Sequence, residues 1–245
     1  MTRLLASVTS AAEAYIALAG GADIIDLKDP ARGALGALAP QQIADTVQAV
    51  AGRRRVSATV GDPPYAPQAL LQRITGTAAA GVDYVKIGIP PQLSAADWRA
   101  LADAVRIAHP ARLVAVLFAD RDPDLSLIER LAGLRFGGVM LDTAAKQSGR
   151  LRDHVDDAVL RHFAERAHAV GLIAGLAGSL RCVDIPHLLP LGADYLGFRG
   201  ALCAGSRREA ELDAMRIADV RRAIATRGAA AVAPVEESSI ADSRP

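Results

Sequence analysis

The segment GADIIDLK, residues 21–28, has the pattern of a helix end followed by a buried strand. Its glycine is suited to end a helix, and the aliphatic residues behind Asp23 are typical of entry into a buried strand. The same junction recurs at Gly81-Val82-Asp83 and at Gly192-Ala193-Asp194. A motif repeated in this way indicates that one helix-to-strand unit is used several times along the chain.

On both sides of that stretch, short runs rich in Val, Ile and Leu alternate with longer Ala-rich segments of helical spacing. Such alternation is typical of βα units that feed a parallel sheet. The sequence predicts strands over residues 4–8, 24–27, 56–59, 84–87, 113–118, 139–141, 172–175 and 195–198. Eight such units close a barrel. We therefore expect a single (β/α)8 catalytic domain over residues 1–225 and a flexible tail over residues 226–245.

The composition suits one β/α domain and gives no sign of binding to nucleic acid or to a membrane. The 245 residues are 51% apolar but only 4% aromatic, so the core has to be built from Ala, Leu, Val and Ile. A formal net charge of +1 gives no electrostatic reason to expect nucleic acid or a membrane as partner. No apolar stretch approaches the roughly 20 residues of a membrane helix. We expect a soluble cytoplasmic protein; a homo-oligomer is compatible with the sequence, which does not define the oligomeric state.

Neither cysteine nor histidine is arranged for a metal. Cys182 and Cys203 are too few for a disulfide framework and lack the paired spacing of a zinc site. The five histidines do not cluster, and we expect surface or packing roles for them. No set of His, Asp and Glu has ligand spacing at the predicted strand ends. The sequence therefore predicts no metal site.

Lysine is confined to three positions, Lys28, Lys86 and Lys146, whereas arginine occurs 25 times. Surface cations tolerate exchange, but a nucleophilic or proton-transferring amine cannot be replaced by a guanidinium that stays protonated. The three lysines end or follow the second, fourth and sixth predicted strands. The carboxyl ends of barrel strands carry the active site, and alternate strands supply one inward layer, so we expect the lysines to converge there. Chance retention is the alternative.

Two carboxylates accompany these lysines. Asp26 lies two residues before Lys28 on the same strand face, and Asp142 ends the sixth predicted strand, four residues before Lys146. A lysine near other cations in a dry pocket can become a neutral nucleophile that forms a Schiff base, while a carboxylate moves protons. The pattern indicates carbonyl chemistry, although loop capping or a salt bridge would also account for either carboxylate.

Glycine-containing loops follow the last two predicted strands. Gly178 and Ser179 come after the seventh strand, and Arg199 and Gly200 come after the eighth. Barrels frequently bind phosphate here because backbone N–H groups point at the anion, and Arg199 could add a charged fork. Ordinary tight turns are the alternative. Asp62, in the turn after the third strand, is expected either to reach substrate over the mouth or to belong to a rigid loop.

The segment GGADIIDLKDP, residues 20–30, closely resembles the (5-formylfuran-3-yl)methyl phosphate synthase family. The resemblance extends over residues 56–62, 84–88, 140–144 and 197–201 and covers the chain to about residue 205. It implies a lyase that joins two molecules of glyceraldehyde 3-phosphate into a furan aldehyde phosphate with loss of phosphate and water. The product would serve methanofuran or a methanofuran-like one-carbon carrier, and neither a metal nor an organic cofactor would be needed.

The same resemblance implies roles for the matching residues. Lys28 would be the Schiff-base lysine and Lys86 the proton acceptor, while Asp26, Asp142 and Lys146 would be supporting acid/base or phosphate-binding groups. The residues themselves agree, because an iminium at Lys28 is an electron sink for proton removal, β-elimination of phosphate and carbon–carbon bond formation. Two alternatives stay open: another Schiff-base aldolase acting on phosphorylated aldehydes, and a non-catalytic barrel that binds a sugar phosphate.

Overall fold

The strands close into one parallel barrel in the computed structural model, which describes residues 1–63, 65–145 and 147–230. They are β1 Arg3–Val8, β2 Ile24–Leu27, β3 Arg55–Thr59, β4 Tyr84–Gly88, β5 Arg112–Phe118, β6 Gly138–Asp142, β7 Ile173–Leu176 and β8 Tyr195–Phe198. Each strand pairs with the next in chain order, and β8 returns to β1. The predicted (β/α)8 barrel is confirmed, with every predicted strand present and displaced by about a residue at most.

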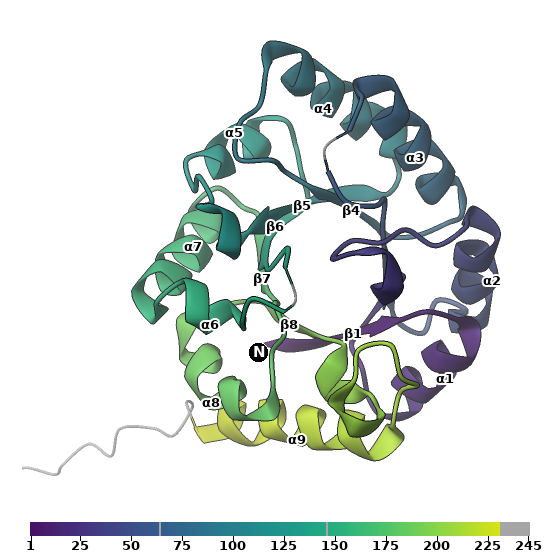
Figure 1. Cartoon of the computed structure of the whole chain (residues 1–245), viewed down its shortest axis with the longest axis vertical. Helices are drawn as coiled ribbons and strands as arrows, with labels where there is room; N and C mark the ends of the chain where they lie inside the picture. Colours follow the sequence, from purple (N-terminus) through teal and green to yellow (C-terminus); the bar gives the residue numbers. More distant parts are fainter. Residues whose placement is uncertain (64, 146, 231–245) are drawn as a thin grey trace, which may run out of the picture.

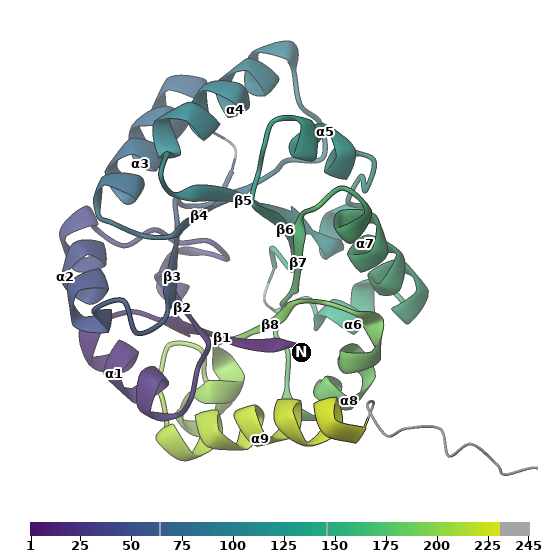
Figure 2. The same cartoon turned by 180° about the vertical axis from the view of Figure 1, so that it is seen from behind.

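The helices surround this ring of strands. They are α1 Ala11–Ala19, α2 Pro40–Val50, α3 Pro67–Ala79, α4 Ala95–Ala108, α5 Leu127–Gly133, α6 Leu151–His154, α7 Asp157–Ala169, α8 Ile185–Leu188 and α9 Ala214–Ala230. Figure 1 shows the strands at the centre and the helices packed outside them, and Figure 2 shows the same arrangement from behind. Among the described residues, no helix has the length and apolar character to cross a membrane.

The repeated Gly-x-Asp junction has a physical cause. Gly21, Gly81 and Gly192 all have φ between 85° and 88°, a left-handed conformation that favours glycine after a helix. The aspartate two residues later accepts the backbone N–H of a neighbouring strand: Asp23 from Leu4 at 2.8 Å, Asp83 from Val56 at 2.8 Å and Asp194 from Ala174 at 2.7 Å. Each junction therefore turns the chain and also satisfies a donor at the amino-terminal edge of the barrel.

Alternation along the strands separates two apolar clusters. Ile25 and Leu27 belong to the large cluster between strands and helices, whereas Ile24 belongs to the cluster that fills the barrel interior. Asp26 has the parity of Ile24, so its carboxylate points into the barrel. The same parity on β6 relates interior Met140 to Asp142. Polar side chains at the carboxyl end of even-numbered strands therefore share one inward layer.

The loop between β2 and α2 is held over the barrel mouth by Asp62. The Asp62 carboxylate accepts the backbone N–H groups of Ala34 at 3.0 Å and Leu35 at 2.8 Å. At Gly33, where φ is 112°, an added Cβ would collide with that carboxylate. Of the two expectations for Asp62, the structure favours the rigid loop.

The end of the barrel differs slightly from the predicted boundary. Helix α9 runs to Ala230, a few residues beyond the predicted limit at residue 225. The rest of the predicted tail, 231–245, lies outside the described residues.

Candidate active site

A cavity of about 520 Å³ lies at the carboxyl ends of the strands. It is lined by the predicted site residues that the structure describes: Asp26, Lys28, Lys86, Asp142, Gly178, Ser179, Arg199 and Gly200. The sequence-based expectation that they gather at one mouth is met for these residues. Lys146 lies outside the described residues. The volume is in the range of small-molecule binding sites.

The floor of the cavity holds a buried ion pair. Lys86 Nζ donates to Asp26 Oδ1 at 3.0 Å, and the two side chains are 2% and 0% exposed. Ser57 Oγ donates to the same carboxylate oxygen at 2.6 Å, and Ser7 Oγ donates to Asp26 Oδ2 at 3.0 Å. Strands β1, β2, β3 and β4 each supply one member of this network, so the barrel itself fixes its geometry.

The charge of Asp26 depends on these neighbours. Burial acts to raise the pKa of Asp26, but the attraction of Lys86 and Lys28 and the hydrogen bonds from Ser57 and Lys86 outweigh it. The pKa of Asp26 is therefore lowered, and Asp26 is a carboxylate at neutral pH. A fixed anion of this kind can steady a nearby cationic iminium and can exchange a proton with Lys86.

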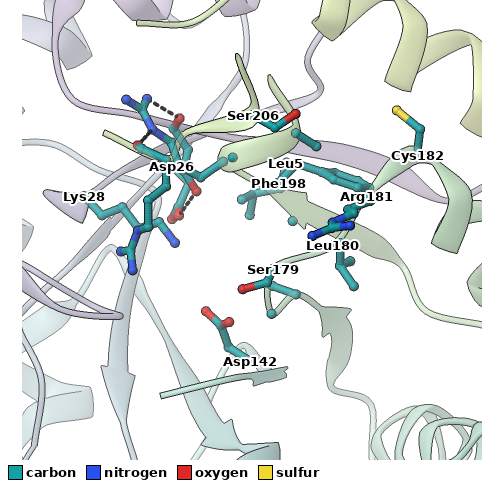
Figure 3. Close-up of a pocket in the computed structure, with 18 of the residues that line it drawn as sticks. Leu5, Asp26, Lys28, Asp142, Ser179, Leu180, Arg181, Cys182, Phe198 and Ser206 are labelled. Atoms are coloured by element: carbon teal, nitrogen blue, oxygen red, sulfur yellow. Dashed lines mark hydrogen bonds between the residues drawn. The ribbon is translucent and has the colours of Figure 1, made fainter. Parts of the chain in front are cut away.

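Lys28 lies just beyond the end of β2, closer to the mouth than the ion pair. Its backbone N–H donates to Val8 O at 3.1 Å, which continues the strand pairing by one residue. Figure 3 shows the Lys28 side chain on the same side of the cavity as Asp26, and Lys28 is one of the two lysines whose attraction lowers the pKa of Asp26. Among Lys28 and Lys86, Lys28 is the more exposed amine, at 8% against 2% for the whole residues.

Asp142 and Ser179 face the same space from the β6 and β7 side (Figure 3). Asp142 is the last residue of β6 and is 2% exposed, and its Oδ1 accepts the backbone N–H of Thr143 at 2.7 Å. Gly178 has φ of 112°, and a Cβ there would come within 2.9 Å of Thr143 Cγ2. The β7 loop can therefore turn tightly beside β6 only with glycine at this position.

Arg199 differs from the sequence-based expectation. Its guanidinium forms an ion pair with Glu13, with Nη1 2.5 Å from Oε2 and Nη2 3.1 Å from Oε1. Its remaining N–H groups donate to the carbonyl oxygens of Ser7, Arg208 and Ala210. These bonds use all five guanidinium donors, so Arg199 offers no free fork to a phosphate and ties β8 to β1 and α1. The expected contact of Arg199 with a phosphate is therefore corrected: its donors are taken up by protein groups.

Four further polar residues line the cavity that no sequence pattern singled out: Arg181, Ser206, Arg208 and Arg216. Ser206 and Arg208 lie in the segment between β8 and α9, which has neither strand nor long-helix periodicity. In a chain with 25 arginines, one further arginine there carries no compositional signal. A usable signal would have been its position, since loops after β8 frequently reach the mouth of a barrel.

Asp120, in the turn after β5, fixes the loop that follows β6. Its Oδ1 and Oδ2 accept the backbone N–H groups of Ala144 and Ala145, each at 2.7 Å. Burial acts to raise the pKa of Asp120, but these two hydrogen bonds and smaller contributions leave it lowered. The next residue in the chain is Lys146, so this carboxylate anchors the segment that leads to the third lysine.

Asp120→Asn is expected to destabilise the protein by about 1 kcal/mol at neutral pH, because an amide has one acceptor oxygen and its NH2 would face an N–H group. A lowered carboxyl pKa contributes stability that is present at neutral pH and lost as pH falls through that pKa. The difference from wild type in urea unfolding should therefore shrink below about pH 4. Asp103→Asn, at an exposed surface ion pair, is the matched control. An equal loss in both variants would contradict the anchoring role.

Within the described part of the chain, no group of three or more His, Cys, Asp or Glu side chains is arranged to hold a metal ion. The lining instead combines amines, carboxylates, guanidinium groups and serine hydroxyls. Such a set can bind a phosphorylated carbonyl compound and move protons within it.

Comparison with known proteins identifies the family of the chain. The family model of 4-HFC-P synthase matches residues 4–221. A relative from Methylorubrum extorquens is 43% identical over 222 residues, which cover 91% of both chains. The (5-formylfuran-3-yl)methyl phosphate synthase of Methanopyrus kandleri is 42% identical over 212 residues, covering 82% of this chain and 89% of that one. A solved 3-hexulose-6-phosphate synthase shares the fold alone, with a TM-score of 0.66 at 22% identity, covering 91% of this chain and 100% of the other.

Proposed function

The chain belongs to the (5-formylfuran-3-yl)methyl phosphate synthase family, also described as 4-HFC-P synthase, and we propose that its cavity carries out the condensation as follows. The substrate is glyceraldehyde 3-phosphate, two molecules of which are condensed through a Schiff base on Lys28. The observation that carries the proposal is the buried Lys86–Asp26 pair directly beside Lys28 at the floor of one cavity. The product would enter the synthesis of methanofuran or a methanofuran-like carrier.

The reaction balances without an oxidant or a reductant. Two triose phosphates, minus one phosphate and two waters, give the composition of (5-formylfuran-3-yl)methyl phosphate. The formyl carbon, the adjacent ring carbon and the next one come from the triose that loses its phosphate. The other triose keeps its phosphate, and its C2, in the keto form, accepts the new carbon–carbon bond. Aldolase-type lyase chemistry is therefore sufficient, together with an isomerisation that moves the carbonyl of the second triose from C1 to C2 by proton transfer.

Lys28 is assigned the imine because it is more exposed than Lys86 and lies beside the Asp26 carboxylate. Its amine condenses with the aldehyde of one triose and releases water, and the resulting iminium acidifies the C2 proton. Removal of that proton gives an enamine, which expels the phosphate from C3. The carboxylate of Asp26 stabilises the cationic iminium through space, in a site where little water competes.

Lys86 and Asp26 act together as the proton-transfer pair. Because Lys86 Nζ lies 3.0 Å from Asp26 Oδ1, a proton can move within the pair and reach or leave the substrate through the lysine. Asp142 faces the same space from the β6 side (Figure 3). It is assigned to transfer protons to and from the second triose. Gly178 and Ser179 are assigned to one substrate phosphate.

The test of the proposed function is product analysis. Purified protein incubated with glyceraldehyde 3-phosphate is expected to produce a furan aldehyde chromophore and about one inorganic phosphate per product, as the balanced reaction requires. Mass spectrometry identifies the product and a phosphate assay gives the ratio. Accumulation of an acyclic aldol would instead support another Schiff-base aldolase, and binding of substrate without turnover would support a sugar-phosphate-binding barrel.

A further inference from the structure

Arg208 stands out among the cations of the cavity because its hydrogen-bonding capacity is largely unused. Its Nη2 donates to Gly33 O at 2.8 Å, and within the described residues this is the side chain's one hydrogen bond to protein. Arg199, a few residues upstream along the chain, uses all five of its donors on protein groups. Arg199 therefore has no N–H donor left for a ligand, whereas Arg208 has several.

The surroundings of Arg208 favour an anionic ligand. The side chain is half-buried, and burial lowers the pKa of Arg208 despite the opposing influence of the Asp142, Glu209 and Asp62 carboxylates. Among the described residues, no carboxylate forms an ion pair with it within 4 Å. A guanidinium that has lost part of its hydration without gaining a counter-ion is stabilised when an anion occupies the space in front of it.

The position of Arg208 separates it from the β7 loop. Arg208 lies in the wall between the main cavity and a neighbouring hollow, whose lining includes Gly33, Ala144 and Arg207. Gly33 follows β2, and Ala144 follows β6, so this wall is built from loops other than the one that carries Gly178 and Ser179. Arg208 and the Gly178–Ser179 loop therefore approach the cavity from different loops.

We propose that Arg208 binds one of the two substrate phosphates, while the Gly178–Ser179 loop binds the other. This inference rests on the proposed function, because a condensation of two triose phosphates brings two phosphate groups into one cavity. A bidentate guanidinium contact fixes the orientation of the second triose as well as its charge. Arg208 is thereby a residue that determines the specificity for a phosphorylated second substrate.

The contact also connects phosphate binding with the loop behind Lys28. Arg208 Nη2 bonds to Gly33 O, and Asp62 holds the N–H groups of Ala34 and Leu35 that follow. A phosphate on Arg208 therefore immobilises the guanidinium that steadies one end of this loop, five residues after Lys28 in the sequence. The second phosphate would help to order the wall next to the imine.

The experiment compares Arg208→Gln with Arg207→Gln, an exposed neighbour in the same segment. Loss of a charge-assisted bidentate contact should raise the KM for glyceraldehyde 3-phosphate roughly 10- to 100-fold, with a smaller change in kcat. Arg208→Lys should fall between wild type and Arg208→Gln, because it keeps the charge but not the fork. The control should match wild type, and circular dichroism establishes that each variant is folded.

A second measurement uses inorganic phosphate as the probe and does not depend on turnover. Calorimetric titration of wild type and Arg207→Gln should show two phosphate sites, and Arg208→Gln should show one. Two sites in Arg208→Gln, or a wild-type KM, would overturn the inference while leaving the proposed function intact. If Arg208→Gln loses one phosphate site but the wild type forms no furan product, the phosphate site at Arg208 would be supported and the proposed function would be wrong.

Discussion

Lys28→Met should abolish covalent trapping of substrate and lower turnover by roughly 10⁴-fold or more, which is the scale on which removal of a catalytic nucleophile acts. Methionine keeps an unbranched side chain only one heavy atom shorter but has no amine, so no iminium can form. Without the iminium, proton removal from C2 and expulsion of phosphate lose their electron sink. Sodium borohydride added to the wild-type protein with glyceraldehyde 3-phosphate should leave a reduced adduct on the peptide that contains Lys28.

Lys28→Arg separates this role from a purely electrostatic one. Arginine keeps the positive charge but stays protonated, so it cannot form an imine. A sugar-phosphate-binding barrel would tolerate this exchange, and substrate binding by calorimetry would be close to that of wild type. Lys86→Met should still be labelled by borohydride, though more slowly. Labelling that survives in Lys28→Met and disappears in Lys86→Met would assign the imine to Lys86, and absence of labelling in wild type would exclude an imine mechanism.

The fold could be predicted from the sequence because its signals are local. Each strand is a short aliphatic run, and the Gly-x-Asp junction marks three of the entries into them. The structure adds the reason for the aspartate, whose carboxylate accepts an N–H from the neighbouring strand, as Asp23 does from Leu4. That bond joins residues 19 positions apart and leaves no periodic trace in the chain.

The site could be predicted as a place but not as a set of contacts. Strand parity puts Asp26, Lys86 and Asp142 in one inward layer, and the structure agrees. The pairing of Lys86 with Asp26 depends on side chains from β2 and β4 meeting inside the barrel, which sequence spacing does not define. The use of the Arg199 guanidinium on protein groups depends on Glu13, which lies in α1, far from Arg199 in sequence. The role of Lys146 stays a prediction from the sequence.

The ion pair on the cavity floor should contribute strongly to stability, and its removal tests the proton-transfer assignment. Lys86→Met leaves the Asp26 carboxylate buried without its main counter-charge, so the expected loss at neutral pH is about 3–5 kcal/mol in urea unfolding. Asp26→Asn leaves Lys86 buried without its partner and should also destabilise. The double variant should lose less than the sum of the two single losses, since it leaves neither charge uncompensated.

The pH dependence of Lys86→Met distinguishes a charged Asp26 from a neutral one. In wild type the pKa of Asp26 is lowered, so its contribution is present at neutral pH and is lost as pH falls through that value. In Lys86→Met, burial becomes the dominant influence and should raise the pKa of Asp26 above its ordinary value. A raised carboxyl pKa costs stability as pH rises, so the deficit relative to wild type should shrink between about pH 7 and pH 5. A deficit that does not change over this range, or losses that are additive in the double variant, would show that the two side chains are not coupled through charge; they could then not share the proton that the mechanism requires.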